Sequence, residues 1–324
     1  MNGRLEREII SKDKMQVKLG DLPKIFEEFY IYLNSDHKSY TTIERYINYV
    51  QDFMMCVTNG RPSNNFYNCI TPTIIKRYIS SLETRNKNGE IIRLGDEIQA
   101  TRWSALNTFF NFLTEEDYIT INPMTKTKRP KVRTKHKVTY LTPDEIQSVF
   151  TKIEHEAKQQ FKNRDLCIIS LGLSTGLRVS AIVQINIDDI DFATNTIKVI
   201  EKGDVKREIG FGKKMRSVLL NWIKDREVFF DVKDINALFI SQQNKRMCTD
   251  AVRDLITKYT SELDKKITPH KLRSTAAMSL HSAGTDVITI MSVLGHENVN
   301  TTLRYVQAYE HEKQNAVNAL DNLI

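Results

Sequence analysis

The sequence predicts a mainly α-helical protein with one small antiparallel β-sheet, organised as two domains. Three observations lead to this fold class. Apolar residues recur at helical spacing through most of residues 17–124. Residues 189–212 instead alternate β-branched and charged residues around Gly203 and Asp204, as a hairpin or three-stranded sheet would. A basic segment, residues 125–139, separates the two parts, and we interpret it as a linker.

The first domain, residues 17–124, is expected to hold four or five helices behind an N-terminal tail of residues 1–16. Helical periodicity marks four segments: residues 19–35, 39–55, 71–83 and 98–116. Thr71 can cap the third of these helices, and Pro72 suits its first turn because proline lacks an N–H there. The polar stretch 84–97 is expected to be a surface loop.

The linker is one-sided in charge, with seven lysines or arginines and no acidic residue. Such a run repels itself, so we expect it to stay extended and to lie along a phosphate backbone; a merely solubilising linker is the alternative. The candidate phosphate contacts are Lys126, Lys128, Arg129, Lys131, Arg133, Lys135 and Lys137. Arg45 and Arg102 lie on predicted helices that could enter a DNA groove.

The composition favours a folded protein with a polyanionic partner. Hydrophobic residues make up 40% of the 324 residues, and the net charge is +7. No apolar run of signal-peptide or membrane-span length occurs, so we expect a cytoplasmic protein without membrane contact. Four cysteines stand far apart without a CxxC pair, and we expect them to be reduced and mostly buried: Cys56, Cys69, Cys167 and Cys248.

The second domain is expected over residues 140–308, followed by a tail helix over residues 309–324. Thr142 and Glu145 have the spacing of a capping box, and residues 164–176 form an apolar run typical of a buried helix. Helices are expected again from residue 213 to the end. In the tail, an apolar stripe could dock on a neighbour or on its own domain: Ala316, Val317, Leu320, Leu323 and Ile324.

Four short motifs in this domain carry possible chemistry. They are "TGLRVS" with Arg178, "KG" followed by "KRE" with Lys202, "HKLR" with His270 and Arg273, and "LGHENVNTTLRY" with His296 and Tyr305. Each has an ordinary explanation alone, such as a solvated lysine, a packing histidine or a core tyrosine. Tyr309 is a second candidate beside Tyr305.

Together, the motifs resemble the boxes of the tyrosine recombinase family, in the family's order and over essentially the whole chain. The resemblance implies a helical, SAM-like core-binding domain and a catalytic domain that close on DNA as a C-shaped clamp. It implies that Tyr305, nine residues after His296, attacks DNA to form a 3′-phosphotyrosine, whereas Tyr309 is expected to be structural. It also implies that strands are exchanged through a Holliday junction. Two departures are Ala181, where many members have an acid, and Ser274, where histidine is frequent.

The chemistry explains why these residue types occur together. Attack on a phosphodiester places negative charge on the nonbridging oxygens, and fixed cations stabilise it. Arg178 and Arg273 each offer a planar fork that binds two phosphate oxygens. The resemblance makes Lys202 the acid for the leaving 5′ oxygen, and makes His270 and His296 hydrogen-bond donors, one of which accepts the tyrosine proton. A tyrosine needs such help because its pKa is about 10.

Two other function classes are compatible with parts of the sequence. A metal hydrolase is disfavoured because neither HExxH nor a cysteine pair supplies usual ligand spacing, and we expect no metal and no cofactor. His281 lies outside the motifs and is expected to be structural. The main alternative is a DNA-binding accessory protein of the same fold that does not cleave.

The resemblance also implies partners. They are double-stranded DNA with inverted-repeat core sites and three further copies of the chain, which form a homotetramer on two sites with exchanged C-terminal tails. Off DNA, a monomer or dimer is expected. The sequence does not distinguish integration, excision, inversion and dimer resolution, since family members with these roles resemble one another too closely.

Overall fold

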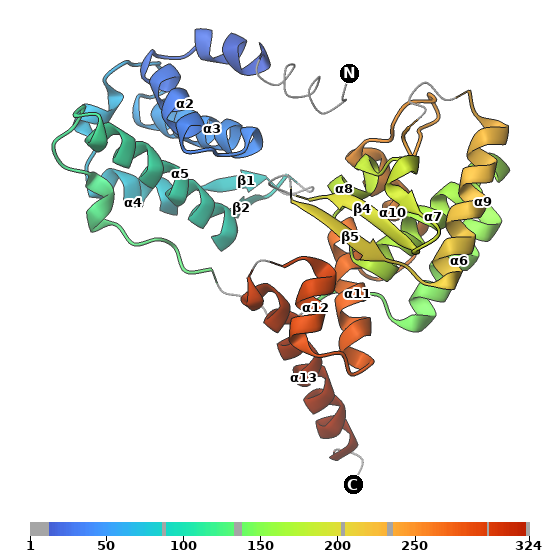
Figure 1. The fold of residues 1–324 in the computed structure, drawn as a ribbon. Coiled ribbons are helices and arrows are strands. Elements are labelled where there is room, and N and C mark those ends of the chain that lie inside the picture. Colours follow the sequence, from blue (N-terminus) through green and yellow to red (C-terminus); the bar gives the residue numbers. More distant parts are fainter. Residues whose placement is uncertain are drawn as a thin grey trace. The chain divides into compact units, whose positions relative to one another are not determined.

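The computed structural model describes residues 13–85, 89–132, 138–201, 205–231, 236–296 and 298–321. The chain divides into two compact units, Met1–Thr134 and Lys135–Ile324. Helices dominate both units, and both sheets are small and antiparallel (Figure 1). The predicted fold class, mainly α with a small antiparallel β-sheet, is therefore confirmed.

The first unit is a helical bundle around an aromatic core. Its elements are α2 (Ile25–Ser35), α3 (Tyr40–Val57), α4 (Pro72–Ser80), α5 (Asp96–Glu115), the 3-10 turns Phe66–Cys69 and Pro123–Lys126, and the strands β1 (Glu83–Arg85) and β2 (Ile91–Arg93). The helical spacing of apolar residues places Phe29 of α2 edge-on against Phe109 of α5, with ring centroids 5.0 Å apart. Thr71 accepts a hydrogen bond from the Ile74 N–H and caps α4 as predicted.

Three details of this unit differ from the sequence-based expectation. The stretch predicted as a loop contains the antiparallel pair β1 and β2, with Thr84 opposite Ile92. The predicted N-terminal tail ends earlier, because residues 13–20 are helical and Met15 is buried in the core. The start of the predicted linker is also packed on the unit, since Trp103 Nε1 donates to Thr127 Oγ1 at 3.0 Å.

The second unit combines eight helices with a three-stranded sheet in its described residues. Its elements are α6 (Pro143–Glu156), α7 (Gln159–Thr175), α8 (Val179–Gln184), β3 (Ile190–Asp191), β4 (Thr196–Ile200), β5 (Lys206–Gly210), α9 (Lys213–Phe229), α10 (Thr249–Tyr259), α11 (Pro269–Ser282), α12 (Val287–Leu294) and α13 (Val299–Asp321). The predicted capping box is present at the start of α6, where Thr142 and Glu145 bond each other's backbone N–H groups.

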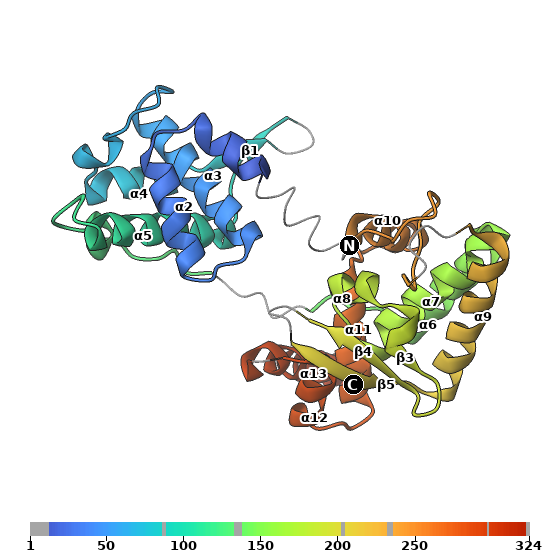
Figure 2. The same cartoon turned by 45° about the horizontal axis from the view of Figure 1, so that its top comes forward.

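The sheet has the order β3-β4-β5, and its alternating pattern fixes which face is buried. Ile197 pairs with Ile209, and both side chains are buried in the unit's core. The strand-like alternation over residues 189–212 therefore predicted this sheet correctly. α8 packs against β4, which brings the end of β4 near the loop that precedes α8 (Figure 2).

The last three helices pack on one another at the end of the chain. α11 contacts α7, and α12 and α13 both contact α11 (Figure 1). α13 runs without interruption from residue 299 to residue 321, so no break in structure marks the expected boundary between residues 308 and 309. Tyr305 and the first part of the predicted tail therefore belong to one helix.

Two further expectations concern the burial of the cysteines and the presence of membrane-spanning helices. Cys167 is buried, whereas Cys56, Cys69 and Cys248 are exposed, so the expectation of mostly buried cysteines was wrong. Burial requires an inward-facing position, which composition does not specify. No helix among the described residues is long and apolar enough to cross a bilayer.

Candidate active site

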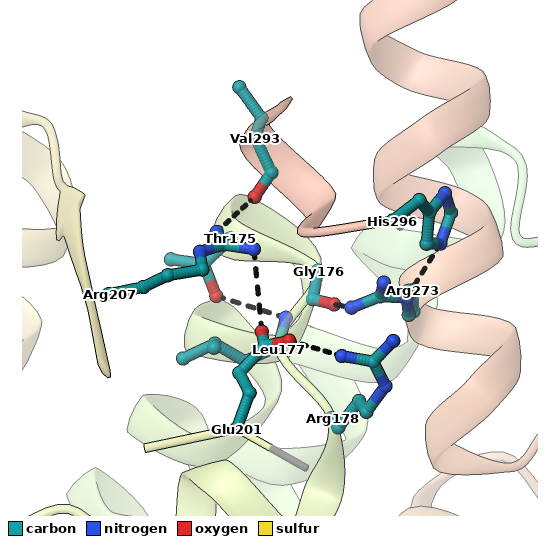
Figure 3. A network of polar contacts seen from close by, with 9 residues as sticks. All are labelled: Thr175, Gly176, Leu177, Arg178, Glu201, Arg207, Arg273, Val293 and His296. Atoms are coloured by element: carbon teal, nitrogen blue, oxygen red, sulfur yellow. Dashed lines mark hydrogen bonds and ion pairs between the residues drawn. The ribbon is translucent and has the colours of Figure 1, made fainter. Parts of the chain in front are cut away.

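Arg178 is placed at a corner between two helices. α7 ends at Gly176, which adopts the left-handed conformation with φ 62°, and Arg178 is the N-cap residue of α8. A Cβ at residue 176 would lie 2.3 Å from Leu294 Cδ2, so this corner requires glycine. The Arg178 side chain leaves the corner 38% exposed and reaches Glu201 with Nη1 (Figure 3).

Arg273 lies on the buried face of α11, beside Arg178 (Figure 3). Its Nη1 donates to the Gly176 carbonyl at 2.8 Å, and its Nε donates to His296 Nε2 at 3.3 Å. Nη2 is buried and has no hydrogen-bond partner among the described residues. Burial and the positive charge of Arg178 lower the pKa of Arg273 to about 10. The fold thus holds two cations close together at a cost in electrostatic energy.

His296 follows a second left-handed glycine. α12 ends at Gly295, with φ 66°, and the chain then turns so that His296 is buried. Nδ1 of the imidazole lies 2.8 Å from Thr302 Oγ1. Because Arg273 always donates, His296 Nε2 must accept, so we assign the proton of the neutral ring to Nδ1, which donates to Thr302. Burial, Arg273 and Arg178 together lower the pKa of His296 to about 4.

The lowered pKa of His296 gives a testable dependence of stability on pH. Between about pH 4 and the ordinary value of 6.5, the unfolded chain binds a proton that the folded chain does not. The stabilisation is therefore complete above pH 6.5 and is lost as the pH falls towards 4. From pH 7 to pH 5, we expect the free energy of unfolding to fall by about 2 kcal/mol more than in His296→Gln.

Urea unfolding of the second unit measures this difference. Trp222 reports on that unit alone in a Trp103→Phe background, since Trp103 lies in the first unit and the chain has two tryptophans. Equal pH dependence of wild type and His296→Gln would show that the buried ring does not resist protonation.

His270 precedes Arg273 by one helical turn on α11, so both side chains lie on the same side of the helix. Partial desolvation by the surrounding protein, together with the charges of Lys271, Arg273, Arg304 and Arg178, lowers the pKa of His270. His270 is exposed, unlike His296. It is therefore neutral near pH 7 and accessible from solvent.

The two tyrosines of the C-terminal helix have different neighbours. Tyr305 is 4% exposed, and its ring lies nearly parallel to that of His296, with centroids 6.1 Å apart. Tyr309 packs edge-on against His281, with centroids 4.8 Å apart. His281 has both ring nitrogens buried without a hydrogen-bond partner among the described residues. The helix therefore directs Tyr305, and not Tyr309, towards the arginine and histidine cluster.

Sequence reasoning missed three residues that organise this cluster. Glu201 is bound by both Arg178 and Arg207, and Thr302 contacts His296. Arg207 also donates from Nη2 to the Val293 carbonyl at 2.7 Å. Glu201 and Arg207 flank Lys202 on the predicted hairpin, and this closeness to Lys202 in the sequence could have marked both as residues of the site.

The remaining predicted residues are the lysine of the hairpin and the candidate DNA contacts. Four of them lie outside the described residues: Lys202, Arg133, Lys135 and Lys137. Five others have exposed side chains: Arg45, Lys126, Lys128, Arg129 and Lys131. Arg102 differs from these, because its guanidinium pairs with Asp52 at 2.9 Å and donates to the Tyr78 hydroxyl at 2.8 Å. Both contacts are made by Nη1, so they hold the Arg102 side chain against the first unit. Ala181 is packed in the core, and Ser274 donates to the His270 carbonyl.

Comparison with known proteins identifies the family. The profile of the phage integrase family matches residues 139–312, more than half of the chain. The chain belongs to the phage integrase family. Tyrosine recombinase XerC of Caldanaerobacter subterraneus subsp. tengcongensis is 35% identical over 225 residues, which cover 68% of this chain and 62% of that protein. XerC of Leptospira interrogans is 31% identical over 239 residues, 73% of this chain and 74% of that protein. The resemblance to tyrosine recombinases is thus confirmed.

Two solved structures share the fold. The XerH site-specific recombinase bound to palindromic difH substrate aligns with TM-score 0.70 and 20% identity, covering 86% of this chain and 80% of that one. A lambda integrase (75–356) dimer bound to a COC′ core site aligns with TM-score 0.64 and 18% identity, covering 86% and 96%. In the described part of this integrase-family chain, no group of three or more His, Cys, Asp or Glu side chains could hold a metal ion.

Proposed function

We propose that this member of the tyrosine recombinases cuts and rejoins DNA at specific sites, with Tyr305 as its nucleophile. One observation carries the proposal: Arg178 and Arg273 lie side by side, and Arg273 is 3% exposed with Nη2 buried and unpartnered among the described residues. Two adjacent guanidinium groups repel each other, and burial of an unpaired donor costs further energy. A bound phosphate offsets both costs, because its oxygens accept from both arginines.

The arginines would stabilise the transition state of strand cleavage. As the tyrosine oxygen approaches phosphorus, charge grows on the nonbridging oxygens that the two guanidinium groups contact. The donors are held in advance by Glu201, Gly176 and His296, so little reorganisation is needed during the reaction. This preorganisation favours cleavage more than it favours binding.

The proton steps follow from the two histidines. We assign His270 as the acceptor of the Tyr305 proton, because it is exposed and its lowered pKa leaves it neutral near pH 7. His296 is less suited, since its Nε2 already accepts from Arg273 and its pKa is about 4. The Tyr305 oxygen forms a bond to phosphorus as the bond to the 5′ oxygen breaks. Lys202 is proposed to protonate that oxygen, and attack by a partner strand's 5′ hydroxyl reverses the step.

The proposed assembly is a tetramer on two inverted-repeat DNA sites in the cytoplasm, without a metal or cofactor. The exposed basic residues 126–131 would follow the DNA backbone, where counterion release supplies affinity. Exchange of the C-terminal tail would link the protomers. Because α13 carries both Tyr305 and the first part of the tail, a neighbour that holds the tail would also set the position of the nucleophile.

A covalent-trapping experiment tests the activity. The probe is a nicked duplex carrying the site that the protein selects from a random-sequence DNA pool. The nick lies a few nucleotides to the 3′ side of the scissile phosphate, so cleavage frees a short fragment with the new 5′ hydroxyl; its loss prevents reversal and traps the phosphotyrosine. We expect an SDS-resistant protein–DNA adduct that forms equally well with and without EDTA.

The same assay separates the rival function. Tight binding to the selected site with no adduct would favour a DNA-binding accessory protein. An adduct that forms only in the absence of EDTA would show that cleavage is covalent but depends on a metal ion, which would overturn the metal-free mechanism.

A further inference from the structure

Glu201 is a buried carboxylate that the proposed cleavage chemistry does not itself use. It follows the last residue of β4 and precedes Lys202, and its side chain is only 5% exposed. One oxygen, Oε2, accepts from Arg178 Nη1, while Oε1 lies 3.5 Å from Arg207 Nη1. A buried carboxylate is costly unless it is paired, and Glu201 has two cationic partners. One of these partners is an arginine of the candidate active site.

Arg207 fixes Glu201 from the other side. Its Nη2 donates to the Val293 carbonyl at the end of α12. A Cβ at Gly295 would lie 1.5 Å from Arg207 Nη1 and 3.1 Å from Glu201 Oε2, so the turn before His296 closes over this pair. The hairpin is thereby tied to the segment that carries His296.

These contacts form a closed circuit around the two site arginines (Figure 3). Arg178 bonds to Glu201, Glu201 to Arg207, and Arg207 to Val293 in the segment that leads to His296. His296 accepts from Arg273, and Arg273 donates to Gly176, two residues before Arg178. Glu201 also opposes the lowering of the Arg273 pKa by burial and by Arg178.

We propose that Glu201 is a positioning residue for strand cleavage: it fixes one edge of the Arg178 guanidinium so that its remaining donors face the scissile phosphate. The inference rests on the proposed function. Arg178 is otherwise a 38% exposed side chain with many rotamers, and ordering it in advance removes that entropic cost from the reaction. Ala181, in the core one turn after Arg178, has no carboxylate that could hold the Arg178 guanidinium. The carboxylate that holds it is instead that of Glu201, at the end of β4.

Single-turnover adduct formation on the nicked duplex tests the proposal. Glu201→Gln is expected to slow cleavage roughly 10- to 100-fold, because the neutral amide holds Arg178 less firmly. DNA affinity is expected to stay near that of wild type. The matched control is Glu208→Gln on β5, an exposed glutamate whose carboxylate accepts from Thr196 Oγ1, and it should cleave at the wild-type rate. Glu201→Asp, which keeps the charge, should recover part of the lost rate.

A double-mutant cycle distinguishes positioning from a general structural role. In an Arg178→Lys background no guanidinium remains to be positioned, so Glu201→Gln should change the rate by less than about twofold. An equal loss in both backgrounds, or a wild-type rate in Glu201→Gln, would overturn the proposal. If wild type and Glu208→Gln both form no adduct, the proposed function fails instead, whereas equal adduct rates in wild type and Glu201→Gln refute only the role of Glu201.

Discussion

Tyr305→Phe is expected to abolish the covalent adduct on the nicked duplex, lowering its rate of formation by at least roughly 10⁴-fold. The change removes only the hydroxyl oxygen that would bond to phosphorus. The ring itself can still pack in the cluster with Ile290 and Leu294 and beside His296, so the fold and DNA affinity should persist. Gel analysis of SDS-treated reactions measures the adduct, and a band-shift titration measures the affinity.

Tyr309→Phe is the matched control on the same helix. Its ring packs against His281, away from the arginine pair, and its aromatic contact survives loss of the hydroxyl. We expect wild-type adduct formation. An adduct that still forms in Tyr305→Phe, or an adduct that is lost in Tyr309→Phe, would show that Tyr305 is not the nucleophile.

Arg273→Ala is expected to slow cleavage by about 10³-fold or more while DNA affinity falls by less than about tenfold. The rate depends on the guanidinium because charge develops on the phosphate oxygens in the transition state. The affinity is spread over many phosphate contacts, so one contact has a small effect on it. Cleavage of the pre-bound, nicked duplex and salt-dependent binding curves give the two quantities separately.

The control for this change is Arg216, a partly buried arginine of the second unit. Arg216 on α9 donates to Asn195 Oδ1 at 2.8 Å and lies outside the candidate site. Arg216→Ala should leave the cleavage rate of the bound complex unchanged. A parallel fall of binding and cleavage in Arg273→Ala would contradict a role in the transition state and would indicate a lost binding contact.

Local patterns accounted for most of the fold. The caps at Thr71 and Thr142 and the buried face of β4 follow from interactions within a few residues, and the sequence displays them directly. The pair β1 and β2 was missed because each strand has three residues, too few to establish an alternating pattern. The continuity of α13 across residues 308 and 309 was also missed, because the tail was expected to be a helix of its own.

The sequence by itself determined the inventory and order of the catalytic candidates, and with them the family. Catalytic roles remain predictions for all six candidates: Arg178, Lys202, His270, Arg273, His296 and Tyr305. Only the tertiary structure decided which side chains meet: Tyr305 lies by His296, Tyr309 by His281, and Glu201 between Arg178 and Arg207. The physical reason is range. Helix periods and caps act between neighbours in the chain, whereas Arg207 and Val293 are 86 residues apart and meet only when α12 packs beside the sheet.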